Sequence, residues 1–262
     1  MKTLKNKYLI PVFVLTGLLL TSCEDLWNRC VDGNGNRAAD NRALQSFSRV
    51  QVNGDFEVQI DTGRISSAIV EADENLVDLI VTHVSGNKLI IETRNGACLR
   101  PSHPIEITIN TQALDEITLN GSGFVYCYGL ETEELSINLS GSGQIECYEA
   151  EASVVNVDLE GSGLINSSLV SENLTTQLEG SGEIRLSGES VNADHKIIGS
   201  GQINAGQVIT DVSIVYISGS GIVETRVNSA LDVTIIGSGI VYYTGNPVLE
   251  SYISGSGKVV ER

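Results

Sequence analysis

Residues 117–125 read Ile-Thr-Leu-Asn-Gly-Ser-Gly-Phe-Val, and residues 137–145 repeat the pattern as Ile-Asn-Leu-Ser-Gly-Ser-Gly-Gln-Ile. The Gly-Ser-Gly motif returns every 18 to 20 residues and begins at Gly121, Gly141, Gly161, Gly180, Gly199, Gly219, Gly237 and Gly255. These eight copies hold 16 of the 27 glycines, so the glycines do not form a flexible linker. Glycine at fixed positions indicates a tight corner that every repeat turns in the same way.

Large aliphatic side chains occupy fixed positions on both sides of each corner. Two residues before the motif stand Leu119, Leu139, Leu159, Leu178, Ile197, Ile217, Ile235 and Ile253. Two residues after it stand Val125, Ile145, Ile165, Ile184, Ile203, Val223, Val241 and Val259. Polar residues alternate with these positions, and a period of two is typical of β-strands with one buried face.

The length of the repeat then selects the fold. It is too short for a propeller blade, and it lacks the Leu and Asn signature of leucine-rich repeats. We therefore predict an all-β protein, a right-handed parallel β-helix (solenoid) with 18–20 residues per coil. Eight Gly-Ser-Gly repeats fill residues 115–262. Burial of the aliphatic columns is expected to contribute most of the stability, at roughly 1.5–3 kcal/mol per side chain.

The segment before the repeats follows the pattern less regularly. Val52 and Phe56 flank a single glycine, Gly54, with the same inward spacing. We interpret residues 44–114 as the irregular opening β part of one continuous domain over 44–262, and a separate small β domain is the alternative.

Several segments, taken in order, resemble one protein family. They are Val-Asn-Gly-Asp-Phe-Glu-Val at 52–58, Ala-Asp-Glu-Asn-Leu at 72–76, Asn-Lys-Leu-Ile-Ile at 87–91, the Gly-Ser-Gly series, and Tyr-Thr-Gly-Asn-Pro at 243–247. Over about residues 47–262 the chain resembles the head GIN domain family of autotransporter adhesins. The resemblance implies a β-helical fold and a cell-envelope setting with an adhesin-like role. It implies no catalytic activity and no defined site residues.

The first residues indicate export. Residues 1–22 carry three lysines and then an apolar run too short to span a membrane, which is the pattern of a signal peptide. Leu-Thr-Ser-Cys at 20–23 resembles a bacterial lipobox, in which the cleaved chain begins with a lipid-bearing cysteine. We therefore expect lipidation at Cys23 and an outer-membrane lipoprotein anchored to the membrane by that lipid. An ordinary signal peptide with a chance cysteine is the alternative.

The residues after Cys23 bear on the orientation in the envelope. Residues 23–43 are rich in Asn and Gly and are predicted to form a polar tether. Glu24 and Asp25 resemble the acidic export signals of surface lipoproteins in Bacteroidetes-type bacteria. The sequence leaves open whether the protein faces the cell surface or the periplasm.

Net charge excludes one class of partner. The chain holds 33 acidic against 16 basic residues, a formal charge of −17, which removes the electrostatic attraction that nucleic-acid binding requires. The expected partners are a glycan or a protein ligand. A second copy of the chain is a further candidate, because an open end of a β-helix offers strand edges for association.

Four cysteines remain after Cys23, namely Cys30, Cys98, Cys127 and Cys147. Four cysteines allow three pairings, and the sequence does not choose among them. Cys127 and Cys147 occupy equivalent repeat positions, so they are predicted to be stacked inward neighbours, with buried free thiols as the simplest interpretation. A bridge between Cys30 and Cys98 is one of the open pairings.

The residues provide little for catalysis. Eight equivalent Gly-Ser-Gly copies argue for a structural corner and against a single activated serine, and no P-loop lysine follows any of them. The three histidines are too scattered for a zinc site, and we expect His195 to be a core histidine beside Thr176 of the preceding coil. We predict no enzymatic activity and no cofactor. A polysaccharide-acting enzyme remains a further alternative, opposed by the scarcity of basic residues in the repeats.

Two sets of outward residues are candidates for binding. Asp158, Glu160 and Glu179 offer carboxylate oxygens of the kind that calcium prefers, and solvated carboxylates are the simpler interpretation. Tyr216, Tyr242 and Tyr252 offer aromatic faces on which sugar rings stack, and scattered surface tyrosines are again the simpler interpretation. We expect a lipid-anchored envelope protein with a non-catalytic binding role, and a purely structural spacer is the main alternative.

Overall fold

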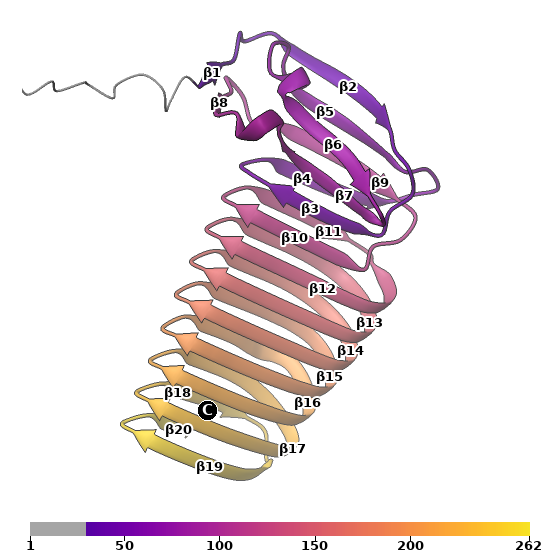
Figure 1. Ribbon diagram of the computed structural model, residues 1–262. Helices are drawn as coiled ribbons and strands as arrows, with labels where there is room; N and C mark the ends of the chain where they lie inside the picture. Colours follow the sequence, from indigo (N-terminus) through magenta and orange to yellow (C-terminus); the bar gives the residue numbers. More distant parts are fainter. Residues whose placement is uncertain (1–29) are drawn as a thin grey trace, which may run out of the picture.

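The computed structural model describes residues 30–262 of the chain. The predicted signal peptide and the predicted lipidation site at Cys23 lie outside the described residues. The protein is 74% strand and 3% helix and forms a β-solenoid of about seven turns, which confirms the predicted fold class (Figure 1). Strand β1 (Val31–Asp32) and strand β20 (Lys258–Glu261) lie at opposite ends of the rod. Within residues 30–262, no helix is long and apolar enough to cross a membrane.

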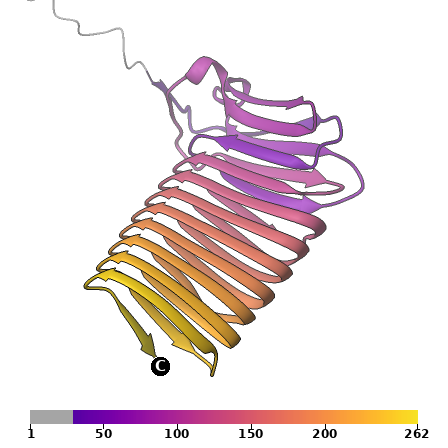
Figure 2. The same ribbon diagram turned by 60° about the horizontal axis from the view of Figure 1, so that its bottom comes forward.

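The repeats form the body of the solenoid (Figure 2). In its middle one long strand runs from each Gly-Ser-Gly corner to the next, whereas the first and last of these segments are each divided into two strands. The strands are β10 (Glu116–Gly121), β11 (Phe124–Tyr128), β12 (Glu131–Gly141), β13 (Gln144–Gly161), β14 (Leu164–Gly180), β15 (Glu183–Gly199), β16 (Gln202–Gly219), β17 (Ile222–Gly237), β18 (Ile240–Thr244), β19 (Val248–Gly255) and β20. All these pairings are parallel, and equivalent repeat positions face each other, as Leu139 faces Leu159.

Backbone contact between coils explains the glycines of the corner. Gly121 has a φ of +136°, a conformation that side chains disfavour, and a Cβ there would lie 2.6 Å from the carbonyl oxygen of Gly54. One coil further, the N–H groups of Ser142 and Gly143 both donate to the carbonyl oxygen of Gly121, at 3.1 and 3.0 Å. The corner therefore has room for backbone only, and each copy hydrogen-bonds to the one before it.

The two aliphatic columns fill the interior. Every member from Leu119 to Ile235 and from Val125 to Val241 is fully buried or nearly so. In the final coil Ile253 is 40% exposed, because β19 has a neighbouring coil on one side only. The inward column is therefore predicted correctly except at its end.

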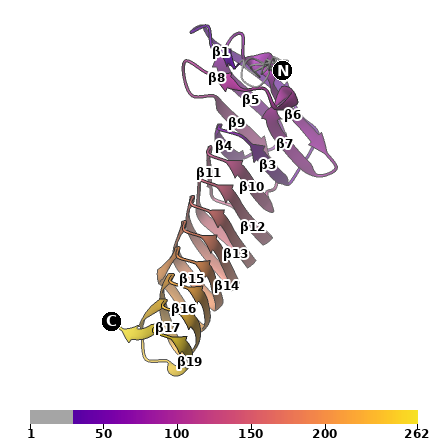
Figure 3. The same cartoon turned by 60° about the vertical axis from the view of Figure 1, so that its left-hand side comes forward.

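The opening part joins the same sheet and then departs from the coil pattern (Figure 3). Strands β3 (Arg49–Asn53) and β4 (Glu57–Thr62) pair in parallel with β10 and β11, and β7 (Lys88–Thr93) and β9 (Glu106–Thr111) add a further parallel layer. The outermost strands, β2 (Arg37–Ala43), β5 (Ser67–Asp73) and β6 (Ile80–Ser85), pair antiparallel with their neighbours. Two short 3-10 helices, Val77–Leu79 and Arg94–Gly96, connect these strands. We call this antiparallel layer the cap, together with the two 3-10 helices and the short parallel pair formed by β1 and β8 (Leu99–Arg100).

The polar tether predicted over residues 23–43 is wrong for residues 30–43, which belong to the cap. Strand β1 pairs with β8 (Leu99–Arg100), and β2 pairs with β5 over its whole length. The Arg42 guanidinium donates to the carbonyl oxygens of Ile80 and Val77, at 2.8 and 3.1 Å. The polar side chain of Arg42 therefore bonds to backbone of the cap, a role that a composition typical of linkers does not indicate.

Candidate functional site

The outward side chains form two sheet faces, one on each side of the Gly-Ser-Gly corner. The leading face is built by the segments that enter the corner and carries the column Asp158, Gln177, Lys196, Tyr216, Thr234 and Tyr252. The trailing face is built by the segments that leave the corner and carries the column Glu146, Asn166, Arg185, Asn204, Glu224 and Tyr242. Each residue lies one coil beyond the previous one, because the strands pair in register.

A groove of about 740 Å³ follows the trailing face. Its lining takes residues from six successive strands, β13 to β18, and includes Tyr148, Asn166, Arg185, Asn204, Glu224 and Tyr242. The groove therefore runs across the strands, along the axis on which the coils stack. Amide, guanidinium, carboxylate and phenol groups meet in it.

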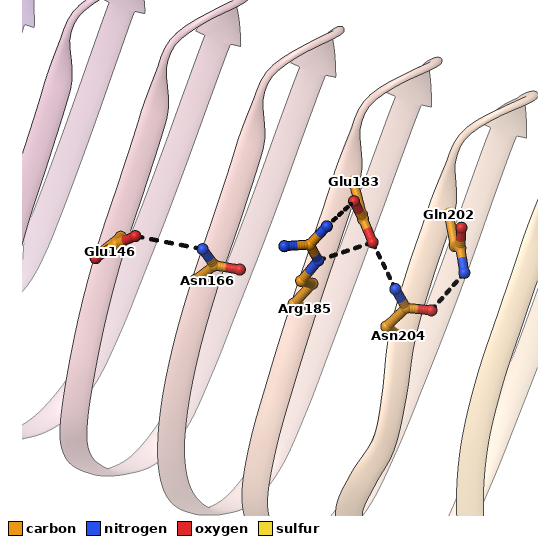
Figure 4. A network of polar contacts seen from close by, with 6 residues as sticks. All are labelled: Glu146, Asn166, Glu183, Arg185, Gln202 and Asn204. Carbon is orange, nitrogen blue, oxygen red and sulfur yellow. Dashed lines mark hydrogen bonds and ion pairs between the residues drawn. The ribbon is translucent and has the colours of Figure 1, made fainter.

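Hydrogen bonds fix the middle of this groove (Figure 4). Arg185 donates from Nε and Nη2 to the two carboxylate oxygens of Glu183, at 2.9 and 2.6 Å. Asn204 donates to the same carboxylate at 2.6 Å and accepts from Gln202 at 2.6 Å. Glu183 also raises the pKa of Arg185 through this bonding. The guanidinium is therefore held flat in a bidentate pair with its charge neutralised locally.

Two aromatic groups mark the ends of the groove. At one end Tyr148 lies beside Tyr126, with ring centroids 6.3 Å apart. At the other end the Arg262 guanidinium lies 3.5 Å from the ring centroid of Tyr242 and pairs with Glu224 at 2.8 Å. Arg262 therefore covers one face of the Tyr242 ring and closes this end of the groove.

A break in strand register lies within the groove. Strand β16 carries extra residues between Asn204 and Gln207 relative to β15, and between Ala205 and Ile209 relative to β17. Gly206 and Gln207, in this bulge, line the groove. Bulges bend a strand and redirect its side chains, and they are common beside functional sites. The regular solenoid is therefore interrupted within the groove itself.

The carboxylates that the sequence singled out lie on the leading face. Asp158, Glu160 and Glu179 line a second groove of about 530 Å³, and Glu160 faces Glu179 one coil away. Burial raises the pKa of Asp158, and the charges of Glu160 and Glu179 raise it further. Within residues 30–262, no three acidic, histidine or cysteine side chains come together as ligands of a metal ion. The three carboxylates share a groove, and calcium binding by them stays a prediction.

The three tyrosines predicted to contact a ligand do not form one site. Tyr216 and Tyr252 lie on the leading face, two coils apart with Thr234 between them, and Tyr252 is 65% exposed. Tyr242 lies on the trailing face. The alternation along each strand correctly predicted that these tyrosines point outward. It did not indicate which of the two sheet faces each tyrosine occupies.

The buried polar residues have structural roles. His195 is completely buried, its Nδ1 lies 2.8 Å from the hydroxyl of Thr176, and burial lowers its pKa from 6.5 to about 4. Cys127 and Cys147 face each other as buried free thiols, as predicted, and burial raises the pKa of Cys127. A disulfide joins Cys30 and Cys98 and ties β1 to the cap.

Sequence reasoning identified Tyr242 in the trailing-face column and missed the polar residues of that column. Asn166, Arg185 and Asn204 each stand one position after the aliphatic residue that follows the corner. Because they alternate with buried aliphatic residues along each strand, the sequence indicates only that their side chains point outward. Amide and guanidinium groups at the same position in three consecutive repeats were the available signal.

Comparisons with known proteins identify the family of the chain and solved structures that share its fold. A family model described as "Putative auto-transporter adhesin, head GIN domain" matches residues 46–247. A comparison with curated proteins found no similar sequence. Among solved structures, a putative lipid binding protein from Parabacteroides distasonis is 27% identical, with a TM-score of 0.81 over 89% of this chain and 100% of that chain.

Two further solved structures share the fold. A putative adhesin from Parabacteroides merdae is 23% identical, with a TM-score of 0.82 over 88% of this chain and 98% of that chain. A putative adhesin from Parabacteroides distasonis is 19% identical, with a TM-score of 0.80 over 88% of this chain and 99% of that chain. The family model spans most of the chain and confirms the resemblance inferred from its motifs: the protein belongs to the family of head GIN domains described as putative auto-transporter adhesins.

Proposed function

We propose that this protein is a non-catalytic, adhesin-like binding protein of the bacterial cell envelope, held at the outer membrane by lipid on Cys23. The trailing-face groove is the observation that carries the proposal. Its polar side chains are already fixed by hydrogen bonds to one another, and a rigid stack of coils supports them. A preorganised surface of this kind is suited to recognition because little side-chain freedom is lost on binding.

The ionisable groups support a binding role over catalysis. In the trailing-face groove Arg185 is paired with Glu183, and Arg262 is paired with Glu224. The strongly lowered pKa of His195 belongs to a side chain completely buried in the core, away from either groove. General acid–base chemistry requires a titrating group within reach of a bound substrate.

The position of the anchor supports display of the groove. Cys30 is tied to Cys98 in the cap, only seven residues after Cys23. Seven residues span at most about 25 Å, so lipid on Cys23 keeps the cap end near the membrane. The groove lies on β13 to β18, toward the other end of the rod. An anchored molecule therefore presents it to partners away from the membrane surface.

Lipid binding is a second candidate, since one relative is described as a lipid binding protein. Strands β14 to β16 carry exposed aliphatic side chains that could contact lipid, interspersed with polar residues such as Glu189 and Asp194: Val170, Val191, Ile209, Val212 and Ile214. Flotation of the full chain carrying Cys23→Ala with neutral phospholipid vesicles tests this candidate. Binding that is lost in Val191→Ser/Ile214→Ser supports it, and no flotation overturns it.

An experiment on bacterial cells that express the full chain tests both the lipid anchor and the exposure at the cell surface. Cells expressing the full chain are fed an alkyne-bearing palmitate and then treated intact with proteinase K. We expect the palmitate label on the wild-type chain and no label on Cys23→Ala. We also expect the protease to digest the wild-type chain on the surface of intact cells. Equal labelling of both proteins contradicts the anchor. Protection from the protease places the groove in the periplasm and contradicts the adhesin-like role in favour of an envelope spacer.

A further inference from the structure

We infer that the trailing-face groove binds a linear, uncharged oligosaccharide whose chain lies parallel to the solenoid axis. The inference rests on the proposed function and names the ligand class of the same site. It places recognition on Asn166, Arg185 and Asn204, and not on the leading-face tyrosines.

The chemistry of the lining matches sugar hydroxyls. A hydroxyl both donates and accepts hydrogen bonds, and planar amides, carboxylates and guanidiniums present paired donors and acceptors to it. Arg185 has five N–H donors, of which the Glu183 carboxylate takes two. The others are available in the groove, since the Arg185 side chain is 54% exposed. Asn166 and Asn204 add further donors and acceptors on the neighbouring coils.

The spacing favours a chain over a single sugar. Neighbouring parallel strands lie about 4.8 Å apart, so equivalent side chains recur at that step along the groove. One pyranose unit advances a linear polysaccharide by a similar length. Asn166, Arg185 and Asn204 lie on three consecutive coils and offer polar groups at each step. An open groove surrounds one sugar poorly, so affinity has to accumulate along several rings.

The two ends of the groove set how many rings are bound. Tyr148 provides an aromatic group at the β13 end, where an apolar sugar face can stack. At the β18 end, Arg262 lies over Tyr242 and pairs with Glu224, which forms a wall. Four coils separate Tyr148 from Tyr242, those of Asn166, Arg185, Asn204 and Glu224. Affinity is therefore expected to rise with chain length up to roughly four to six rings and then to level off.

The charges select an uncharged ligand. Arg185 and Arg262 are each neutralised by a carboxylate, and the rest of the chain is strongly acidic at a formal −17. A chain of uronic acids or sulfated sugars would meet Glu224 in the lining, while both arginines of the lining are already paired with carboxylates. Repulsion at this range disfavours such ligands.

The test uses the full chain with Cys23→Ala, which removes the proposed anchor at a position outside the described residues. The probes are gluco-, xylo-, manno-, galacto- and N-acetyllactosamine-type oligosaccharides of one to eight rings, immobilised on an array, with oligogalacturonates as the acidic set. The test variant is Asn166→Ala/Arg185→Ala. The control variant is Gln177→Ala/Lys196→Ala, an amide and a cation on the same two strands, β14 and β15, on the leading face. Circular dichroism verifies that both variants are folded.

We expect at least one neutral series to bind, with affinity reduced roughly tenfold or more in the trailing-face variant and unchanged in the control. Equal loss in both variants, or loss only in the control, overturns the groove assignment and leaves a glycan-binding function elsewhere. Tighter binding of oligogalacturonates than of the neutral series overturns the inference that the ligand is uncharged. No binding to any probe overturns the inference, while labelling of Cys23 and surface exposure decide the proposed function separately.

Discussion

Each corner of the solenoid depends on single residues that adopt a conformation disfavoured for side chains. Gly180 has a φ of +122°, and a Cβ added there would lie 2.5 Å from the carbonyl oxygen of Gly161 in the preceding coil. The strain and the clash act together, because backbone in a stacked coil cannot move aside without breaking the hydrogen bonds of its neighbours.

Substitution of this glycine is therefore predicted to destabilise the fold. Gly180→Ala should lower the free energy of unfolding by about 1–3 kcal/mol. Ser181→Ala, in the same corner, is the control and should change it by less than about 0.5 kcal/mol. Urea denaturation followed by circular dichroism measures both. Equal stabilities for the two variants would show that the corner tolerates a side chain.

His195 is predicted to make stability depend on pH. Burial lowers its pKa from 6.5 to about 4 in the folded protein, and the unfolded chain exposes the ring to water. Between these values the unfolded state binds a proton that the folded state does not, so stability falls as the pH falls from about 6.5 towards 4. Wild-type protein should lose about 1 kcal/mol more than His195→Leu between pH 7.5 and pH 5.5. Identical losses in urea denaturation at the two pH values would mean that the ring is not buried in its neutral form.

At the scale of elements, the number of neighbouring coils decides what a side chain contributes. Ile197 and Ile253 occupy the same position two residues before a corner, yet Ile197 is fully buried and Ile253 is 40% exposed. Ile197 lies in β15, between β14 and β16, whereas Ile253 lies in the last coil. The sequence alone makes these two residues equivalent.

This pair gives a matched prediction. Ile197→Ala should lower the free energy of unfolding by about 2–5 kcal/mol, because it leaves a cavity in a close-packed interior. Ile253→Ala should cost less than about 1 kcal/mol, because solvent already reaches the site. Chemical denaturation of both variants measures the difference. Similar losses would indicate that a further element covers the last coil in solution.

At the scale of the whole molecule, periodic features were predictable from the sequence and non-periodic ones were not. Columns such as Leu119 to Ile235 follow from alternation, because one strand register buries all of them together. The cap strand β2 escaped prediction because its polar residue Arg42 bonds to backbone that lies 35 and 38 positions later in the chain. The trailing-face groove escaped it because alternation identifies outward residues without stating which of two sheets they occupy.

The central claim is that ligand binds the trailing face of the rod, and tyrosines on both faces allow a direct measurement. Hydroxyl-radical footprinting of the full chain, with and without the best-binding oligosaccharide from the array, reports the exposure of Tyr148 and Tyr242 against Tyr216 and Tyr252. The account predicts slower oxidation of Tyr148 and Tyr242 in the complex and unchanged oxidation of Tyr216 and Tyr252. Protection of the leading-face pair, or of neither pair, would contradict it.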